Sequence, residues 1–239
     1  MADMDSEFKV EKGFVVSGIQ SFPIEDISRI SWGAIDTKLN GVNVGTKYVI
    51  YFGDNEKLAT VSVGTSDYFD TVTSQLWEAV AYPLAVRIAH ALKGGQALNF
   101  GGIVVSDAKV SLSKPSGVPF VGKPTIRSYG WGQIDMQSQN GRLWLYPIND
   151  EKGPSGSSSY IENYNTAVLA HLIRIAKSKN LNTISDVFTA QEYATFESQA
   201  KSTQAYTQLP GDKPNKLSIG QMIATCIIVL VVLYFTLPK

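Results

Sequence analysis

The sequence predicts an α+β fold, mostly β, in which two successive halves of the chain each place short strands before one amphipathic helix. Three observations lead to this prediction. Short runs of β-branched and aromatic residues alternate with Gly and Asn turns, which is typical of antiparallel strands. Two longer segments carry apolar residues at helical spacing. A five-residue pattern occurs once in each half, which indicates an internal repeat.

The composition is that of a folded globular protein of 239 residues, with 44% hydrophobic and 18% charged residues. The 21 basic residues balance 21 acidic ones. Because nucleic-acid-binding proteins usually carry a basic excess, no nucleic-acid partner is expected. The single cysteine, Cys226, excludes an intrachain disulfide.

The repeated pattern is Trp-Gly-x-Ile-Asp, beginning at Trp32 and again at Trp131. Downstream of each copy lies an apolar helical pattern containing Arg-Ile-Ala, at Arg87 and at Arg174. The two tryptophans are expected to be core residues beneath the helices rather than ligand contacts, since a tryptophan buries a large area. The pattern indicates a duplication.

In the first half, four strands are expected, at residues 14–16, 24–36, 47–52 and 59–63. One long helix is expected over residues 66–93, because apolar side chains recur there every three or four positions. The pair Gly94-Gly95 should end this helix. Pro83, in its interior, should kink it or divide it in two.

In the second half, strands are expected at residues 98–105, 108–112, 126–136 and 142–148, with an Asn140-Gly141 hairpin turn. A helix is expected from about residue 161 to residue 178. The Ser/Gly-rich residues 153–157 lack the last glycine of a nucleophile elbow, so they are predicted to be a mobile hairpin loop.

This order of elements, followed by Gly-x-x-Leu-x-Phe-Gly from Gly95 to Gly101, resembles an uncharacterised family of tandem pleckstrin-homology-like (PH-like) proteins. The resemblance covers about residues 8–178. It implies two PH-like modules, residues 8–95 and 96–179, after an N-terminal tail of residues 1–7. Each module would be a bent antiparallel sheet with one end closed by its C-terminal helix. The resemblance brings no catalytic residues with it.

Residues 180–217 are expected to be a helical linker and tether. Thr189 and Glu192 fit a capping box at the start of a helix. The segment 184–201 weakly resembles the short helical SHOCT-type module, and a plain tether helix is the alternative. Residues 202–215, with Pro210-Gly211 and Pro214, are expected to be a flexible tether.

The final segment is predicted to be a single transmembrane anchor, residues 218–237. From Ile219 to Leu237 there is no charged residue. At 1.5 Å per residue this run spans roughly 28 Å as a helix, close to the ~30 Å hydrocarbon core of a bilayer. The residues expected to form the anchor are Ile219, Met222, Ile223, Ile227, Ile228, Val229, Leu230, Val231, Val232, Leu233, Tyr234 and Phe235.

The expected localisation is a membrane, with a single pass and the N-terminal body in the cytoplasm. The N-terminus shows no basic region followed by an apolar stretch, so no secretory signal peptide is expected. Lys213 and Lys216 precede the apolar run on the body side, which agrees with the positive-inside rule. The chain is therefore interpreted as tail-anchored.

Few residues point to chemistry. Phosphate-binding Gly-rich motifs are not found, and His90 and His171 occupy different positions relative to the repeat. Asp36 and Asp135 end the repeated motifs and are expected to accept structural hydrogen bonds. We therefore predict no catalytic, cofactor-binding or metal-ligating residues, and no cofactor.

Four basic residues lie in one stretch of the second half, and a basic loop in a PH-like fold can meet anionic lipid head groups. They are Lys109, Lys114, Lys123 and Arg127. Spread over a long stretch, they are better explained as a solvated loop. The function expected from the sequence is a non-enzymatic protein-interaction scaffold or accessory subunit of a membrane complex. Lipid sensing through anionic head groups is the alternative, and an enzyme is a third, disfavoured class.

Overall fold

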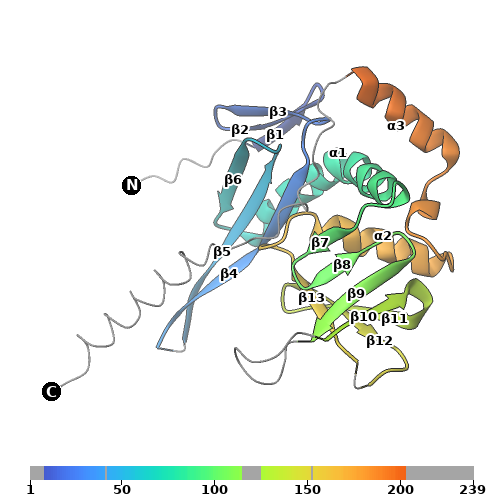
Figure 1. The fold of residues 1–239 in the computed structure, drawn as a ribbon. Coiled ribbons are helices and arrows are strands. Elements are labelled where there is room, and N and C mark those ends of the chain that lie inside the picture. The colour runs from blue at the N-terminus through green and yellow to red at the C-terminus, as the bar shows by residue number, and fades with distance from the viewer. Residues whose placement is uncertain (1–7, 41, 115–124, 152, 203–239) are drawn as a thin grey trace, which may run out of the picture.

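The computed structural model describes residues 8–40, 42–114, 125–151 and 153–202. It confirms an α+β fold, mostly β, with several antiparallel sheets and three α-helices (Figure 1). The first half comprises β1 (Phe8–Glu11), β2 (Phe14–Ser17), β3 (Gln20–Pro23), β4 (Arg29–Leu39), β5 (Val42–Gly53), β6 (Leu58–Val63) and α1 (Ser66–Lys93). The second comprises β7 (Leu98–Phe100), β8 (Ile103–Val105), β9 (Lys109–Lys114), β10 (Thr125–Gly130), the 3₁₀ turn η1 (Trp131–Gln133), β11 (Ile134–Gln139), β12 (Arg142–Pro147), β13 (Gly156–Ser159) and α2 (Thr166–Ser178). A second 3₁₀ turn, η2 (Ser185–Val187), and α3 (Ala190–Ser202) follow.

Both halves build their sheets from strands that are neighbours in sequence. The first half has two three-stranded sheets, β1-β2-β3 and β4-β5-β6, and the second has the four-stranded β7–β10 sheet and the three-stranded β11-β12-β13 sheet. The sequence did not predict β1 or β3. Each of these strands has four residues, too few for the alternation of apolar and polar side chains to be recognised.

The β4–β5 hairpin is much longer than its sheet. β4 and β5 pair from Arg29 and Gly53 to Leu39 and Val42, whereas β6 pairs only with the part of β5 from Tyr48 onwards. Residues 34–40 and 42–47 therefore form a two-stranded projection, here called the ribbon, which extends past β6 (Figure 1).

Helix α1 has the predicted bounds and ends at Gly94, whose N–H donates to the carbonyl of His90 at 3.0 Å. The expectation that Pro83 would divide it is wrong, because one continuous helix runs through Pro83. A proline removes one backbone hydrogen bond of the helix. Here the flanking side chains of Val80 and Leu84 are fully buried, and this packing holds the helix together across the proline.

In the second half, two predicted strands are each interrupted. The predicted strand 98–105 is two strands, β7 and β8, because Gly101 at φ 68° turns the chain between them. The predicted strand 126–136 is divided into β10 and β11 by η1, which begins at the buried Trp131. In both cases the residues on either side of the turn are apolar, so the sequence pattern resembled that of one continuous strand.

The prediction of a loop at residues 153–157 is wrong for residues 156 and 157, because β13 begins at Gly156 and pairs with β12. Small residues are required there: a Cβ added at Gly156 would come within 2.8 Å of the Leu112 side chain. Ser158 is fully buried and its hydroxyl lies 2.6 Å from that of Thr166. Helix α2 begins at Thr166 rather than near residue 161, because Asn165 takes a left-handed conformation at φ 63°.

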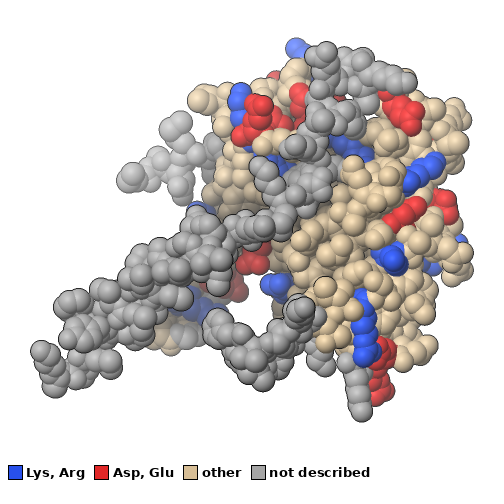
Figure 2. Space-filling view, viewed as in Figure 1, with Lys and Arg blue, Asp and Glu red and all other residues tan. Residues whose placement is uncertain are grey.

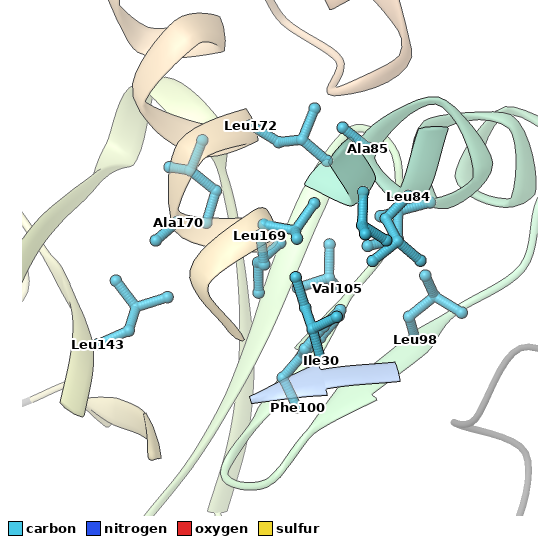
Figure 3. Packing of buried hydrophobic residues seen from close by; sticks show 14 of the residues in the cluster. Ile30, Leu84, Ala85, Leu98, Phe100, Val105, Leu143, Leu169, Ala170 and Leu172 are labelled. Carbon is cyan, nitrogen blue, oxygen red and sulfur yellow. The ribbon is translucent and has the colours of Figure 1, made fainter. Parts of the chain in front are cut away.

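The two halves share one hydrophobic core. Figure 3 shows Leu84 and Ala85 of α1 and Leu169 and Leu172 of α2 among the side chains of one buried cluster. Ile30 of β4 belongs to the same cluster, as do Leu98, Phe100, Val105, Leu143 and Ala170 from the second half. Burying apolar surface contributes roughly 25 cal/mol per Å², so each half is stabilised by surface that the other supplies.

Asn165 joins the halves through hydrogen bonds to β4 and the residue before it. Its backbone N–H donates to the carbonyl of Ile30 at 2.7 Å, and its side-chain oxygen accepts from the N–H of Ile30 at 3.0 Å. The side-chain amide donates to the carbonyl of Ser28 at 2.8 Å. The Asn165 side chain thus takes the place of a paired strand along this part of β4.

Helix α3 packs against α1. The predicted capping box forms, with the N–H of Thr189 donating to Glu192 at 2.7 Å and the N–H of Glu192 donating to the Thr189 hydroxyl at 3.3 Å. Tyr193 is buried beside Val86 and Ala89 of α1, and its hydroxyl donates to the carbonyl of Ser185 at 2.7 Å. The part of the expected linker that the structure describes is thus attached to the body.

Candidate functional site

The basic residues singled out from the sequence are not gathered on one surface. Lys109 lies opposite Gly130, and Arg127 lies opposite Leu112, in the β9–β10 hairpin. Side chains alternate between the faces of a strand, so Lys109 lies on the face opposite to that of Leu112 and Arg127. Lys114 ends β9, and Lys123 lies outside the described residues.

Arg127 is engaged in an ion pair. Its guanidinium donates to the Asp150 carboxylate at 2.6 Å, and the Tyr129 hydroxyl donates to the same carboxylate oxygen at 2.8 Å. The hydrogen bonds from Tyr129 and Arg127 lower the pKa of Asp150, and the bond to Asp150 raises the pKa of Arg127. An arginine held in this way is less available to a lipid phosphate, so the geometry favours a structural role for Arg127.

The two histidines contact different elements. His90 of α1 faces α3, where its Nε2 lies 3.1 Å from a Glu197 carboxylate oxygen. His171 of α2 packs edge-to-face on Trp77 of α1, with ring centroids 5.3 Å apart. Within the residues that the structure describes, no three His, Cys, Asp or Glu side chains converge in a way that could hold a metal ion.

His171 predicts a pH dependence of stability. Burial, and secondly the charge of Arg174, lower the pKa of His171 below its usual 6.5. The unfolded chain therefore binds the proton more readily, so the stability that the neutral ring provides is present above about pH 6.5 and is lost as the pH falls through the folded-state pKa. Between pH 7 and pH 5 the thermal unfolding midpoint should decrease.

Thermal unfolding followed by circular dichroism at several pH values would test this. His171→Phe keeps an aromatic ring against Trp77 and removes the titrating group, so its midpoint should vary less over the same pH range. An unchanged pH dependence in His171→Phe would contradict the assignment.

The repeated motif has different surroundings in its two copies. Trp131 is fully buried in η1 and its indole N–H donates to the carbonyl of Asp107 at 2.7 Å. Trp32 lies within β4, is half-buried, and packs edge-to-face on Trp77 of α1 at 6.0 Å. A Cβ added at Gly33 would come within 3.1 Å of the Ile161 side chain. Both tryptophans are structural residues, as expected, but only Trp131 is a fully buried one.

The two aspartates of the motif also make structural hydrogen bonds. Asp36 accepts from the Thr46 hydroxyl at 2.7 Å across the ribbon. Asp135 accepts from the N–H of Met136 at 2.8 Å and lies 3.5 Å from the ammonium of Lys177. The bond from Met136 is the largest cause of the lowered pKa of Asp135. Both groups therefore have structural partners.

A groove of about 600 Å³ lies between β1 and α1, and the sequence did not indicate it. Its apolar part comes from the buried Phe8, the half-buried Val10 and their neighbours, and its rim carries exposed charged side chains. The residues that line it are Phe8, Lys9, Val10, Glu11, Ile24, Gln75, Glu78 and Ala79. Its strand β1 was not predicted, so no sequence signal could have identified this groove.

Another surface, which has few charges, is the outer face of the β7–β10 sheet. Val104 and Ser111 are neighbours there, the hydroxyls of Ser111 and Ser128 lie 2.8 Å apart, and Ile126 is exposed. Figure 2 shows a broad area over β7–β9 without Lys, Arg, Asp or Glu, and charged side chains towards its edges.

The predicted anchor, residues 218–237, lies outside the described residues, as does the predicted tether from residue 203 onwards. None of the described helices is both long and apolar enough to cross a membrane. No family model, curated protein or solved structure matches this chain.

Proposed function

We propose that this chain is a membrane protein, held by a single span at residues 218–237, whose body presents tandem PH-like modules as a non-enzymatic interaction scaffold or accessory subunit of a membrane complex. The observation that carries the proposal is the uncharged apolar run of 19 residues from Ile219 to Leu237. Such a run is long enough to cross the hydrocarbon core of a bilayer. Lys213 and Lys216 on its body side favour a cytoplasmic body.

The arrangement of the elements supports PH-like modules. In the second half, a four-stranded and a three-stranded antiparallel sheet precede α2, and in the first half two three-stranded sheets precede α1. The repeated Trp-Gly-x-Ile-Asp motif supports duplication, although its tryptophans lie in a strand and in a 3₁₀ turn. A fold of this kind serves lipids, peptides and protein surfaces alike, so the role is inferred from surfaces rather than from the fold.

The surfaces favour scaffolding over lipid sensing. The outer face of the β7–β10 sheet offers apolar area with few charges, and the groove between β1 and α1 combines apolar side chains with a charged rim. Lipid sensing needs several cations near one surface, each contributing about 1 kcal/mol close to anionic head groups. Arg127 is bound to Asp150 and lies on the face opposite to that of Lys109, which weakens this alternative.

Truncation tests the membrane attachment. A chain ending at Asn215 should be recovered in the soluble fraction after cell disruption, whereas the full chain should sediment with membranes and resist a high-salt wash. The matched control is a full chain with Ile227→Lys and Val231→Lys, because two charges in the apolar run should also prevent stable insertion. If the truncated chain stays with membranes after the salt wash, residues 219–237 are not the principal attachment.

Vesicle co-sedimentation of the same truncated chain separates the two roles. Scaffolding predicts no binding to vesicles that contain phosphoinositide. Binding that is lost in Lys109→Ala and Arg127→Ala would instead favour lipid sensing.

A further inference from the structure

Among the residues that the structure describes, no strand pairs with the outer edge of β4 in the ribbon. β4 is an edge strand of its sheet. Within the described part of the chain, the segment 160–165 bonds to β4 at Ile30 and Trp32, and no hydrogen bond to the backbone is recorded on this edge from residue 34 to residue 39. Such an edge pairs readily with another strand.

We propose that a second copy of this chain pairs with this edge, forming an antiparallel dimer whose two-fold axis passes through Thr37. The inference does not depend on the proposed membrane function. It rests on the direction of the backbone groups, on the order of charges along β4 and on the exposed apolar side chains of the ribbon.

The bonds to the segment 160–165 establish which backbone groups point outward. The N–H of Trp32 donates to the carbonyl of Tyr160 at 3.2 Å, and the carbonyl of Ile30 accepts from Asn165 at 2.7 Å. Backbone groups alternate along a strand, so those of Asp36 and Lys38 also point outward. The one irregularity of the hairpin inserts Val44 into β5, which leaves β4 regular.

Charge selects one register among those that these outward groups allow. With Thr37 opposite Thr37 of the second copy, Asp36 lies opposite Lys38, and the two residues can exchange a pair of backbone hydrogen bonds. A shift in one direction places Asp36 opposite Asp36, and a shift in the other places Lys38 opposite Lys38. Like charges directly opposite each other are destabilising. Of these three registers, only the one centred on Thr37 places Asp36 and Lys38 opposite residues of opposite charge.

The same register pairs the apolar side chains on the other face of the ribbon. Ile35 and Leu39 lie on one face with Thr37, and they are 46% and 64% exposed. In the dimer, Ile35 of each copy lies opposite Leu39 of the other, with Val42 beside Leu39. The interface is isologous, as in most two-fold dimers, and it removes these side chains from water.

Site-specific crosslinking of the full chain in detergent micelles tests the register, with Cys226→Ala to remove the native thiol. A Thr37→Cys pair across the axis would have Cα atoms about 4.5 Å apart, which is within the range for a disulfide. Mild oxidation should therefore convert most of Thr37→Cys into a covalent dimer. The matched control is Val44→Cys, which is 57% exposed on β5 of the same ribbon and should form at least about tenfold less dimer.

Charge exchange supplies the second test. In the Thr37→Cys background, Asp36→Lys or Lys38→Asp alone places like charges at both symmetry-related pairs and should weaken dimerisation about tenfold or more. The double variant Asp36→Lys, Lys38→Asp restores opposite charges and should restore the crosslink. The proposal is overturned if Thr37→Cys crosslinks no better than Val44→Cys, or if the double variant crosslinks as poorly as the single ones. It is also overturned if a fluorophore at residue 39 is shielded by lipid or by another protein while the chain remains monomeric.

Discussion

Asn165→Ala should lower the free energy of unfolding by about 3–5 kcal/mol. The substitution leaves the N–H of Ile30 and the carbonyl of Ser28 without the partners they have at 3.0 and 2.8 Å. Each buried polar group left unsatisfied costs about 1–3 kcal/mol, and alanine adds about 1–2 kcal/mol in the left-handed region at φ 63°. Chemical denaturation of the wild-type and variant chains would measure the difference.

Asn180 provides the matched control. It also has a left-handed backbone, at φ 53°, but it is exposed. Asn180→Ala should therefore cost only the backbone term of about 1–2 kcal/mol. Asn165→Gly separates the two contributions, because glycine tolerates the left-handed conformation while still removing the side-chain bonds. Equal costs for the two alanine variants would show that the Asn165 side chain does not join the halves.

The second large effect is expected at Trp131. Trp131→Ala removes a fully buried ring and the hydrogen bond to the Asp107 carbonyl. Large-to-small substitutions of buried aromatic residues typically cost about 3–5 kcal/mol. Denaturant unfolding should show a loss of this size, with the near-ultraviolet circular dichroism also reduced.

Trp32→Ala is the comparison that the internal repeat offers. Trp32 is half-buried on β4 against Trp77, so its removal should cost about 1–2 kcal/mol. The two tryptophans share a sequence motif but not a local structure, and the difference in cost measures that divergence. Losses of the same size at both positions would argue against this distinction.

The sequence predicted the fold most accurately where the periodic pattern was long. Helix α1 was predicted with both of its ends, because its 28 residues repeat the helical pattern many times and Gly94 follows them. Short strands with mixed composition, such as β1 and β13, gave no such repetition. The turns at Gly101 and Trp131 were missed because the residues on both sides of each turn are apolar.

The candidate surfaces were less predictable, because they depend on which strands become neighbours. The basic residues could be counted in the sequence, but the ion pair between Arg127 and Asp150 forms only when the end of β12 is brought beside β10. The groove needs β1 beside α1, which follows more than 50 residues later. By contrast, the order Ile-Asp-Thr-Lys-Leu from Ile35 to Leu39 can be read in the sequence, but the pairing proposed for it depends on β4 being an edge strand.

The core shared by α1 and α2 has a consequence for biosynthesis. The apolar face of α1, which includes Leu84, is completed by Leu169 and Leu172, which the ribosome adds more than 70 residues later. At about 5–20 residues per second this interval lasts on the order of ten seconds. During that time the nascent first half exposes apolar surface that its own strands cannot fully cover. Chaperones that shield such surface would act on this chain before α2 emerges, and a stalled first half would be a target for degradation.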